Sequence, residues 1–121
     1  GEQALAADVA HAAGRWPMVL GDDLDAAGLA AVLAALRVLV GNDSGPLHLA
    51  ALAGASVIGL FGPTDPSRTG PLGGGHRVVS RTLVRSPCQA PVCPHGHQRC
   101  LRELSVEEVE TAILEVVQKG R

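Results

Sequence analysis

The sequence predicts an α/β fold in which a parallel sheet has helices on both faces. Three short apolar runs, at residues 17–20, 38–40 and 56–61, are each bounded by glycine, proline or a polar turn, which is typical of buried strands. Segments with helical spacing of apolar residues alternate with these runs, and the connections are short. With 121 residues, 46% of them hydrophobic and 18% charged, the chain has the size and composition of one globular domain.

The first elements follow in chain order. Residues 2–13 have helical spacing and end at Gly14, a common residue at helix carboxyl ends. The run 17–20 is bounded by proline and glycine and is predicted to be a buried strand. Residues 25–36 are helical again, since four apolar side chains recur at spacings of three and four. The next strand, 38–40, leads into a polar turn with two glycines.

The middle of the chain continues this alternation. Residues 46–53 are predicted to form a short helix, with proline in the first turn, where it is favoured. Residues 56–61 form the next strand. Residues 62–75 hold five glycines and three prolines and are predicted to be a long loop, before an edge strand at 76–80.

The last third consists of an irregular segment and a final helix. Residues 86–100 combine cysteine, histidine and proline and are predicted to form a loop without regular structure. A helix follows at 105–117, where Ser105 and Glu108 have the spacing of a capping box. We expect the whole chain, 1–121, to form one ligand-binding domain.

Charge and composition exclude several classes of protein. The net charge is −2 and there is no basic block, which argues against nucleic-acid binding. Residues 44–64 carry no charge and have the length of a membrane span, but their glycines and prolines favour a helix, a turn and a strand. No signal peptide is recognisable and three cysteines are an odd number, so we expect a reducing cytoplasm.

The strongest functional signal lies at the turn after strand 38–40. Asp43, Ser44 and Gly45 stand between the strand and a helix, and His48 lies one turn into that helix. Ligands bind at this edge of open α/β sheets, and a helix amino terminus favours a phosphate or diphosphate. Local chemistry leaves a second interpretation open, in which Asp43 or Ser44 caps the helix and His48 packs against the sheet.

Residues 40–66, Val-Gly-Asn-Asp-Ser-Gly-Pro-Leu-His through Phe-Gly-Pro-Thr-Asp-Pro, closely resemble the heptosyltransferase family. The resemblance extends to Glu2-Gln3-Ala4, to 23–25 and to the Cys/His segment 88–101. It implies a GT-B glycosyltransferase with two Rossmann-like domains, of which this chain is the C-terminal, donor-binding half, truncated on its amino-terminal side. The implied activity is inverting transfer of heptose or a related sugar, from a nucleotide-sugar such as ADP-heptose, to a lipopolysaccharide-type or other glycan acceptor.

The resemblance also implies residue roles. Asp43 would contact the transferred sugar, Ser44 and Gly45 the diphosphate, His48 the phosphates or the sugar, and Glu2 the ribose of the donor. In addition, Thr64 and Asp65 would shape the pocket. The catalytic residue is unknown from this sequence, because the base is expected in the missing N-terminal domain.

The implied strand order is 3-2-1-4-5-6, with the first two strands upstream of Gly1. Strands 17–20 and 37–40 would then be separated by a gap. We expect that 17–20 pairs directly with 37–40 or that a second copy of the chain fills the gap.

Two further patterns suggest metal binding, and we interpret both as structural. In Asp22-Asp23-Leu24-Asp25 the carboxylates directly precede a helix, where aspartate serves as a cap. Cys88, Cys93 and Cys100, with two histidines among them, lack the paired spacing that is typical of zinc sites. We therefore expect neither a metal nor another cofactor.

Two other hypotheses stay open, a stand-alone nucleotide-binding module without catalysis and a zinc-stabilised interaction domain. As partners we expect the nucleotide-sugar donor and, through the missing domain, a glycan acceptor, and no nucleic acid. We also consider peripheral membrane association of the full-length enzyme and self-association of the fragment.

Overall fold

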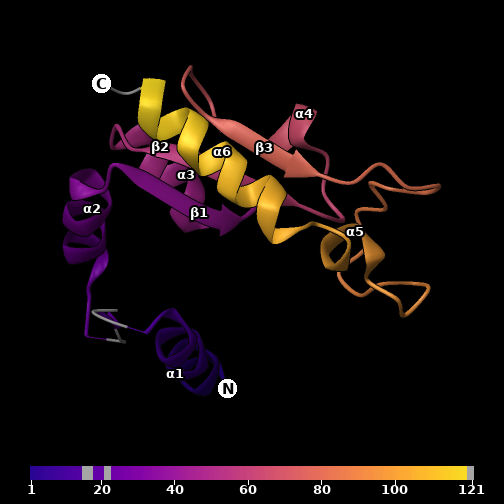
Figure 1. Ribbon diagram of the computed structural model, residues 1–121, viewed down its shortest axis with the longest axis horizontal. Coiled ribbons are helices and arrows are strands. Elements are labelled where there is room, and N and C mark those ends of the chain that lie inside the picture. Colours follow the sequence, from indigo (N-terminus) through magenta and orange to yellow (C-terminus); the bar gives the residue numbers. More distant parts are fainter. Residues whose placement is uncertain (15–17, 21–22, 120–121) are drawn as a thin grey trace.

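The computed structural model of the chain describes residues 1–14, 18–20 and 23–119. Its centre is a parallel sheet of three strands, β1 (Val38–Asn42), β2 (Ser56–Phe61) and β3 (Arg77–Ser80), which lie side by side in chain order (Figure 1). The α/β class and the parallel sheet are confirmed. The order of these strands agrees with positions 4-5-6 of the order that the resemblance implies.

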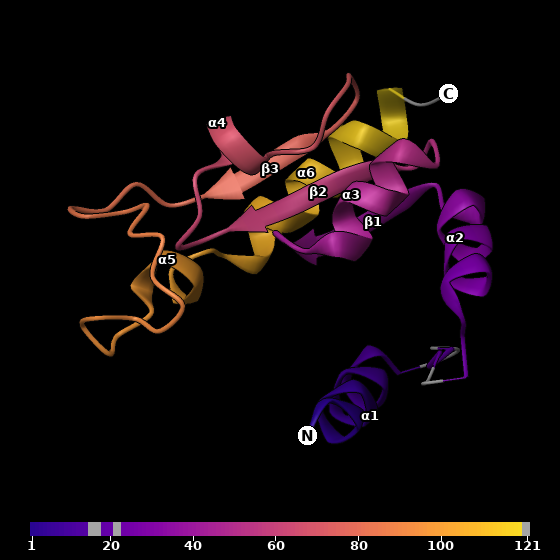
Figure 2. The same ribbon diagram turned by 180° about the vertical axis from the view of Figure 1, so that it is seen from behind.

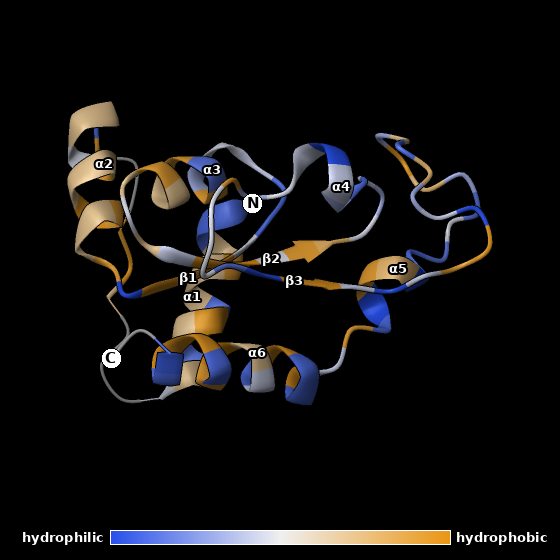
Figure 3. Ribbon diagram, turned by 90° about the horizontal axis from the view of Figure 1, so that it is seen from above, coloured by the Kyte–Doolittle hydropathy of each residue, from blue (hydrophilic) through white to orange (hydrophobic). Residues whose placement is uncertain are grey.

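Helices cover both faces of the sheet. α2 and α3 lie on one face and α6 crosses the other, as Figures 2 and 3 show from two directions. The helices are α1 (Glu2–Ala13), α2 (Ala26–Ala35), α3 (Gly45–Leu52), α4 (Pro66–Thr69), α5 (Arg99–Arg102) and α6 (Val106–Lys119). In the described part of the chain, no helix has the length and apolarity needed to cross a membrane. The uncharged segment 44–64 instead contains α3 and β2, as predicted.

The position of β2 at the centre of the sheet explains why its sequence is almost entirely apolar. Val57 and Phe61 pack on the α3 face with Leu47, whereas Ile58 packs on the α6 face with Val116. All five of these side chains are at least 95% buried. A parallel strand that is covered on both faces loses the alternation of polar and apolar residues that marks a half-exposed strand.

The helix caps that the sequence predicts are present at α2 and α6. Asp25 Oδ1 accepts a hydrogen bond from the Gly28 backbone N–H at 2.7 Å, so this aspartate is a cap; Asp22 of the same motif lies outside the described residues. At α6, Ser105 and Glu108 form the reciprocal capping box, with N···O distances of 2.8 and 3.1 Å. The Ser105 backbone N–H and hydroxyl, with the nearby Arg81, hold the pKa of Glu108 below its ordinary value.

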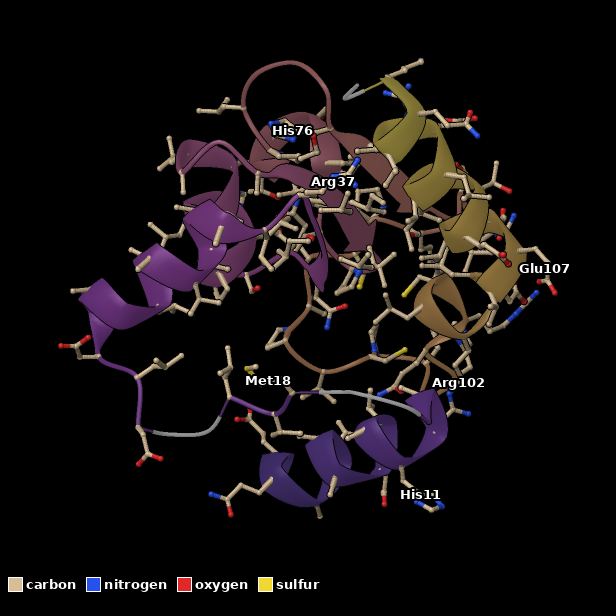
Figure 4. The ribbon with its side chains drawn as sticks, turned by 60° about the vertical axis from the view of Figure 1, so that its left-hand side comes forward. His11, Met18, Arg37, His76, Arg102 and Glu107 are labelled. Carbon is tan, nitrogen blue, oxygen red and sulfur yellow. The ribbon has the colours of Figure 1, made fainter. Side chains whose placement is uncertain are left out.

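The strand predicted at 17–20 is wrong over the described residues. Met18, Val19 and Leu20 form no strand, and Met18 is 82% exposed; Pro17 lies outside the described residues. An apolar run becomes a strand only where a neighbouring strand supplies its hydrogen bonds. Here Met18 instead lies beside α1 (Figure 4).

The predicted pairing of 17–20 with 37–40 is therefore also wrong for the described residues. β1 pairs with β2 alone in the described sheet. Filling of the gap by a second copy of the chain stays a prediction.

The loop predicted at 62–75 contains the short helix α4. Asp65 caps it, Pro66 stands in its first turn, and Gly70 ends it. A Cβ atom at Gly70 would lie 2.4 Å from the Pro66 carbonyl oxygen, so the helix can end here only on glycine.

The edge strand β3 begins at Arg77, one residue later than predicted. His76 instead uses its side chain, because its ring Nδ1 accepts the Val57 backbone N–H at 3.1 Å. Figure 4 shows His76 near Arg37, at the end of the sheet where the strands begin.

The close packing of β2 against α3 can be tested at Gly59. A Cβ atom there would lie 2.5 Å from Cε2 of the buried Phe61 ring and 3.3 Å from Leu47 Cδ2. Because the ring cannot move away within a packed core, we expect Gly59→Ala to lower the free energy of unfolding by about 1–3 kcal/mol in denaturant titrations.

Gly41→Ala is the matched control. Gly41 is the register partner of Gly59 on β1, and its added Cβ would make only ordinary contacts of 3.6 Å and beyond. Equal losses of stability in the two variants would contradict this account of the packing.

Candidate functional site

Two loops meet at the edge where the strands end. Because β1 and β2 are parallel, the segments that follow them, 43–44 and 62–65, leave the sheet at the same edge. The first leads into α3 and the second into α4. Hydrogen bonds from Thr64 and Thr69 to Asp43 show that the two segments lie together.

The Asp43 carboxylate joins the two loops. Its Oδ1 lies 3.1 Å from His48 Nε2 on α3, and its Oδ2 accepts the Thr69 hydroxyl of α4 at 2.7 Å. The Thr64 hydroxyl is a third hydrogen-bond donor. The side chain of Asp43 is 15% exposed and that of His48 is 38% exposed, so both remain accessible from outside.

These contacts keep Asp43 ionised. Partial burial by itself would raise the pKa of this carboxyl, but the hydrogen bonds from Thr69, Thr64 and His48 outweigh it and hold the pKa below its ordinary value. A lowered pKa stabilises the fold above the unfolded-state value, and this contribution is lost only as the pH falls below about 4. At neutral pH the carboxylate is therefore a fixed hydrogen-bond acceptor.

The amino terminus of α3 carries no side-chain cap in the described structure. Ser44 occupies the cap position, but its hydroxyl donates to the Asn42 carbonyl at 3.2 Å, and Asp43 binds His48 and Thr69. The alternative interpretation of these residues as simple caps is therefore wrong.

Backbone donors are consequently available at this end of α3. Ser44 and Gly45 are exposed, and a Cβ added to Gly45 would meet no atom within 4 Å. Their N–H groups stand at the positive end of a helix dipole, which is the arrangement that binds phosphate groups.

The other predicted site residues lie in different settings. Asp65 Oδ1 accepts the Ser67 hydroxyl and backbone N–H at 2.7 and 2.9 Å, so this carboxylate caps α4 and stiffens the loop that carries Thr64. Glu2 begins α1, which lies apart from the sheet (Figure 1), and the structure does not bring it to Asp43. Its role as a ribose ligand stays a prediction.

Thr69 is the site residue that sequence reasoning missed. It was placed inside a long loop, whereas it ends α4 and binds Asp43 across 26 positions of sequence. A signal was present, because Asp65-Pro66 and Gly70 are the start and stop residues of a short helix. The partner of Thr69 could not be found from the sequence, since it depends on how the two loops meet.

A hollow on the opposite face of the sheet does not suit an anionic ligand. It has a volume of about 490 Å³ and is lined by Leu60, by Asn42 and mostly by apolar side chains from Leu101 to Ile113. Glu110 is its charged lining residue, and this carboxylate would repel a phosphate.

The Cys/His segment stays without an assigned role. Cys88, Cys93 and Cys100 are free thiols. Among the described residues, no group of three or more histidine, cysteine or acidic side chains is placed to hold a metal ion. The expectation that the segment binds no metal stays a prediction.

Comparison with known proteins agrees with the motif at this edge. Residues 2–98 match the model of glycosyltransferase family 9 (heptosyltransferase), and the matched region includes Asp43, His48 and Thr69. The chain belongs to this family.

Similar proteins include heptosyltransferases of three bacteria. Lipooligosaccharide heptosyltransferase 2 of Campylobacter jejuni is 34% identical over 73 residues, which are 60% of this chain and 23% of that protein. Lipopolysaccharide heptosyltransferase 1 of Pseudomonas aeruginosa is 36% identical over 88 residues (70% and 25%). Lipopolysaccharide heptosyltransferase 2 of Escherichia coli is 33% identical over 78 residues (64% and 22%). The chain thus matches about a quarter of the length of these relatives, and no solved structure matches it.

The pKa of the Asp43 carboxyl should depend on the hydroxyl of Thr69. Thr69→Val keeps the shape of the side chain and removes the hydroxyl that donates to Oδ2. We expect the pKa of Asp43 to rise toward its ordinary value, because a hydrogen bond to the charged form is lost, and this can be followed by NMR titration of the carboxyl carbon. Thr111→Val on the exposed face of α6 is the control. An unchanged Asp43 titration in Thr69→Val would contradict the assignment.

Proposed function

We propose that the strand edge at Asp43 binds the nucleotide-sugar donor of a sugar-transfer reaction. The transferred group is heptose or a related sugar, the donor is a nucleotide-sugar such as ADP-heptose, and the acceptor is a lipopolysaccharide-type or other glycan. The observation that carries the proposal is the uncapped amino terminus of α3 beside an ionised, anchored carboxylate. Family membership and the heptosyltransferase relatives support it.

The diphosphate of the donor is assigned to the amino terminus of α3. The Ser44 and Gly45 N–H groups would donate to its oxygens, and the helix dipole would favour its negative charge. A carboxylate capping this helix would repel the same diphosphate. Because Asp43 is bound to His48 and Thr69, its carboxylate does not occupy the helix end.

Asp43 is assigned to a hydroxyl of the transferred sugar. An ionised carboxylate has about four lone-pair sites, and the hydrogen bonds to His48, Thr69 and Thr64 use three of them. About one site is left, so Asp43 can accept one hydrogen bond from the sugar. Its three protein partners fix the direction of that bond.

His48 is assigned to the departing phosphate or to the sugar. Its Nε2 donates to the Asp43 carboxylate, which holds the imidazole in one orientation, so a contact to a phosphate oxygen would come from the Nδ1–H of the doubly protonated ring. The helix end would then stabilise the negative charge that develops on the diphosphate as it leaves, without a metal ion.

The transfer itself needs a second group. A base in the remaining part of the full-length protein would take the proton of an acceptor hydroxyl, whose oxygen attacks the anomeric carbon. The bond from that carbon to the diphosphate breaks, the electron pair leaves with the diphosphate, and the configuration inverts. We place this reaction in the cytoplasm and assign the acceptor site to the same remaining part of a GT-B enzyme.

The binding role is tested by titrating ADP and ADP-sugars into the chain. We expect saturable binding of both ligands, with the sugar adding affinity. His48→Ala should weaken both ligands about tenfold, and Asp43→Ala should remove the extra affinity of the sugar, since each loses a charge-assisted hydrogen bond. The exposed His11→Ala and Asp8→Ala on α1 are the matched controls. No binding of either ligand by the folded chain would overturn the proposal.

In the full-length enzyme, Asp43→Ala or His48→Ala should reduce the transfer rate by about a hundredfold or more while the fold stays intact. Steady-state kinetics measure the rate, and circular dichroism checks the fold. Activity of both variants within a few-fold of wild type would contradict the site assignment.

A further inference from the structure

The candidate functional site has little positive charge of its own. A diphosphate ester carries a negative charge on each phosphate, and the ionised Asp43 carboxylate directly precedes the helix end assigned to these phosphates. The dipole of α3 contributes only about half an elementary charge. A protonated His48 would offset only the carboxylate to which its Nε2 donates. A donor bound at this edge therefore still needs a cation.

The described arginines fall into two groups. Three of them are paired with glutamates, whereas the others are exposed and have no ion pair among the described residues. An unpaired guanidinium can take phosphate as its partner, because its planar fork of N–H groups fits phosphate oxygens. The paired arginines are Arg77, Arg81 and Arg99, and the unpaired ones are Arg37, Arg68, Arg85 and Arg102.

Of the unpaired arginines in the described chain, Arg68 is the one that the fold holds at the Asp43 edge. Arg37 directly precedes β1 and lies at the opposite edge of the sheet, where the strands begin (Figure 4). Arg85 belongs to the connection between β3 and α5, and Arg102 belongs to α5. In the described structure, no hydrogen bond joins that connection or α5 to α4 or to Asp43. Arg68 instead lies within α4, which binds Asp43 directly.

Two observations place the Arg68 side chain near the site. The next residue, Thr69, donates to Asp43 Oδ2 at 2.7 Å, and consecutive Cα atoms are only about 3.8 Å apart. In addition, hydrogen bonds from Ser67 and the positive charge of Arg68 hold the pKa of Asp65 below its ordinary value, so the guanidinium acts on the loop that leads into α4. The Asp65 carboxylate is bound to Ser67 and forms no ion pair with Arg68. The guanidinium is thus available beside the two loops that form the site.

We propose that Arg68 binds the diphosphate of the donor and stabilises it as it leaves. Its guanidinium donates to the phosphate oxygens from the side of α4, while the Ser44 and Gly45 N–H groups donate from the amino terminus of α3. The methylene groups of the side chain let the guanidinium reach across from α4 to this helix end. This role of Arg68 rests on the donor-binding role of the Asp43 edge and adds to it a cation from the segment after β2.

Neighbouring residues of α4 would then have different tasks. Thr69 is uncharged and holds the Asp43 carboxylate, whereas Arg68 offsets the charge of the phosphates. As the bond to the anomeric carbon breaks, the negative charge on the diphosphate increases. A guanidinium that is already in place therefore stabilises the transition state more than the bound donor, and its loss should lower kcat as well as affinity.

Calorimetric titrations of inorganic pyrophosphate, ADP and AMP into the chain test this role. Arg68→Gln should weaken pyrophosphate and ADP about tenfold, since charge-assisted hydrogen bonds are lost, and should weaken AMP less, because AMP has a single phosphate. Arg68→Lys keeps the charge but not the planar fork and should recover only part of the loss. Circular dichroism checks that each variant is folded.

Arg102→Gln is the matched control. Arg102 is also exposed and unpaired, and it also lies in a helix of four residues, so the variant makes the same change of net charge in a similar setting. It should bind all three ligands as wild type does. In the full-length enzyme, Arg68→Gln should lower kcat about tenfold or more, and Arg102→Gln should leave it unchanged.

Two outcomes would overturn the assignment of Arg68. Equal losses of affinity in Arg68→Gln and Arg102→Gln would show an effect of net charge alone. Unchanged affinity for pyrophosphate and ADP in Arg68→Gln would show that the guanidinium does not bind the diphosphate, and a lower kcat in that case would assign it to the acceptor. In both outcomes the wild-type chain still binds ADP, whereas a failure of the proposed donor site would abolish binding to the wild-type chain itself.

Discussion

The hydrogen bond from Thr69 to Asp43 is the contact on which the site depends. It joins the loop after β1 to the helix after β2, and with His48 it fixes the carboxylate in an ionised state. If this contact were absent, Asp43 could turn toward the uncapped end of α3, where the helix dipole attracts a carboxylate. The anion-binding end of the helix would then be occupied by the chain's own negative charge. The same contact thus positions an acceptor for the sugar and leaves backbone donors for the phosphates.

The sheet makes this contact possible because its strands are parallel. Parallel strands deliver their following loops to a single edge, and the tight packing of β2 against α3, through Gly59 and Phe61, sets the distance between the loops. The close approach of α5 has a similar effect at Gly62, where an added Cβ would lie 2.6 Å from the Leu101 side chain. The packing of the core therefore also determines the geometry of the site.

Local signals predicted most of the fold, and long-range partners account for the rest. The strand at 56–61 was predicted with its observed bounds because its apolar run and flanking turns are contained within the strand itself. The run at 17–20 is also apolar but has no neighbouring strand in the described chain, and Met18 is exposed. Asp43 and His48 were found from their motif, whereas Thr69 was missed because its importance comes from a partner 26 residues away.

The central claim is that the Ser44 and Gly45 N–H groups receive the diphosphate of the donor. It is tested most directly by recording amide resonances of the isotope-labelled chain while inorganic pyrophosphate, and then ADP, is added. The account predicts that the amide resonances of Ser44 and Gly45 shift most and that both reach their final positions at the same ligand concentration. The amide resonances of Leu60 and Ile113, which line the apolar hollow, should not shift. Saturable shifts at that hollow, with Ser44 and Gly45 unchanged, would contradict it.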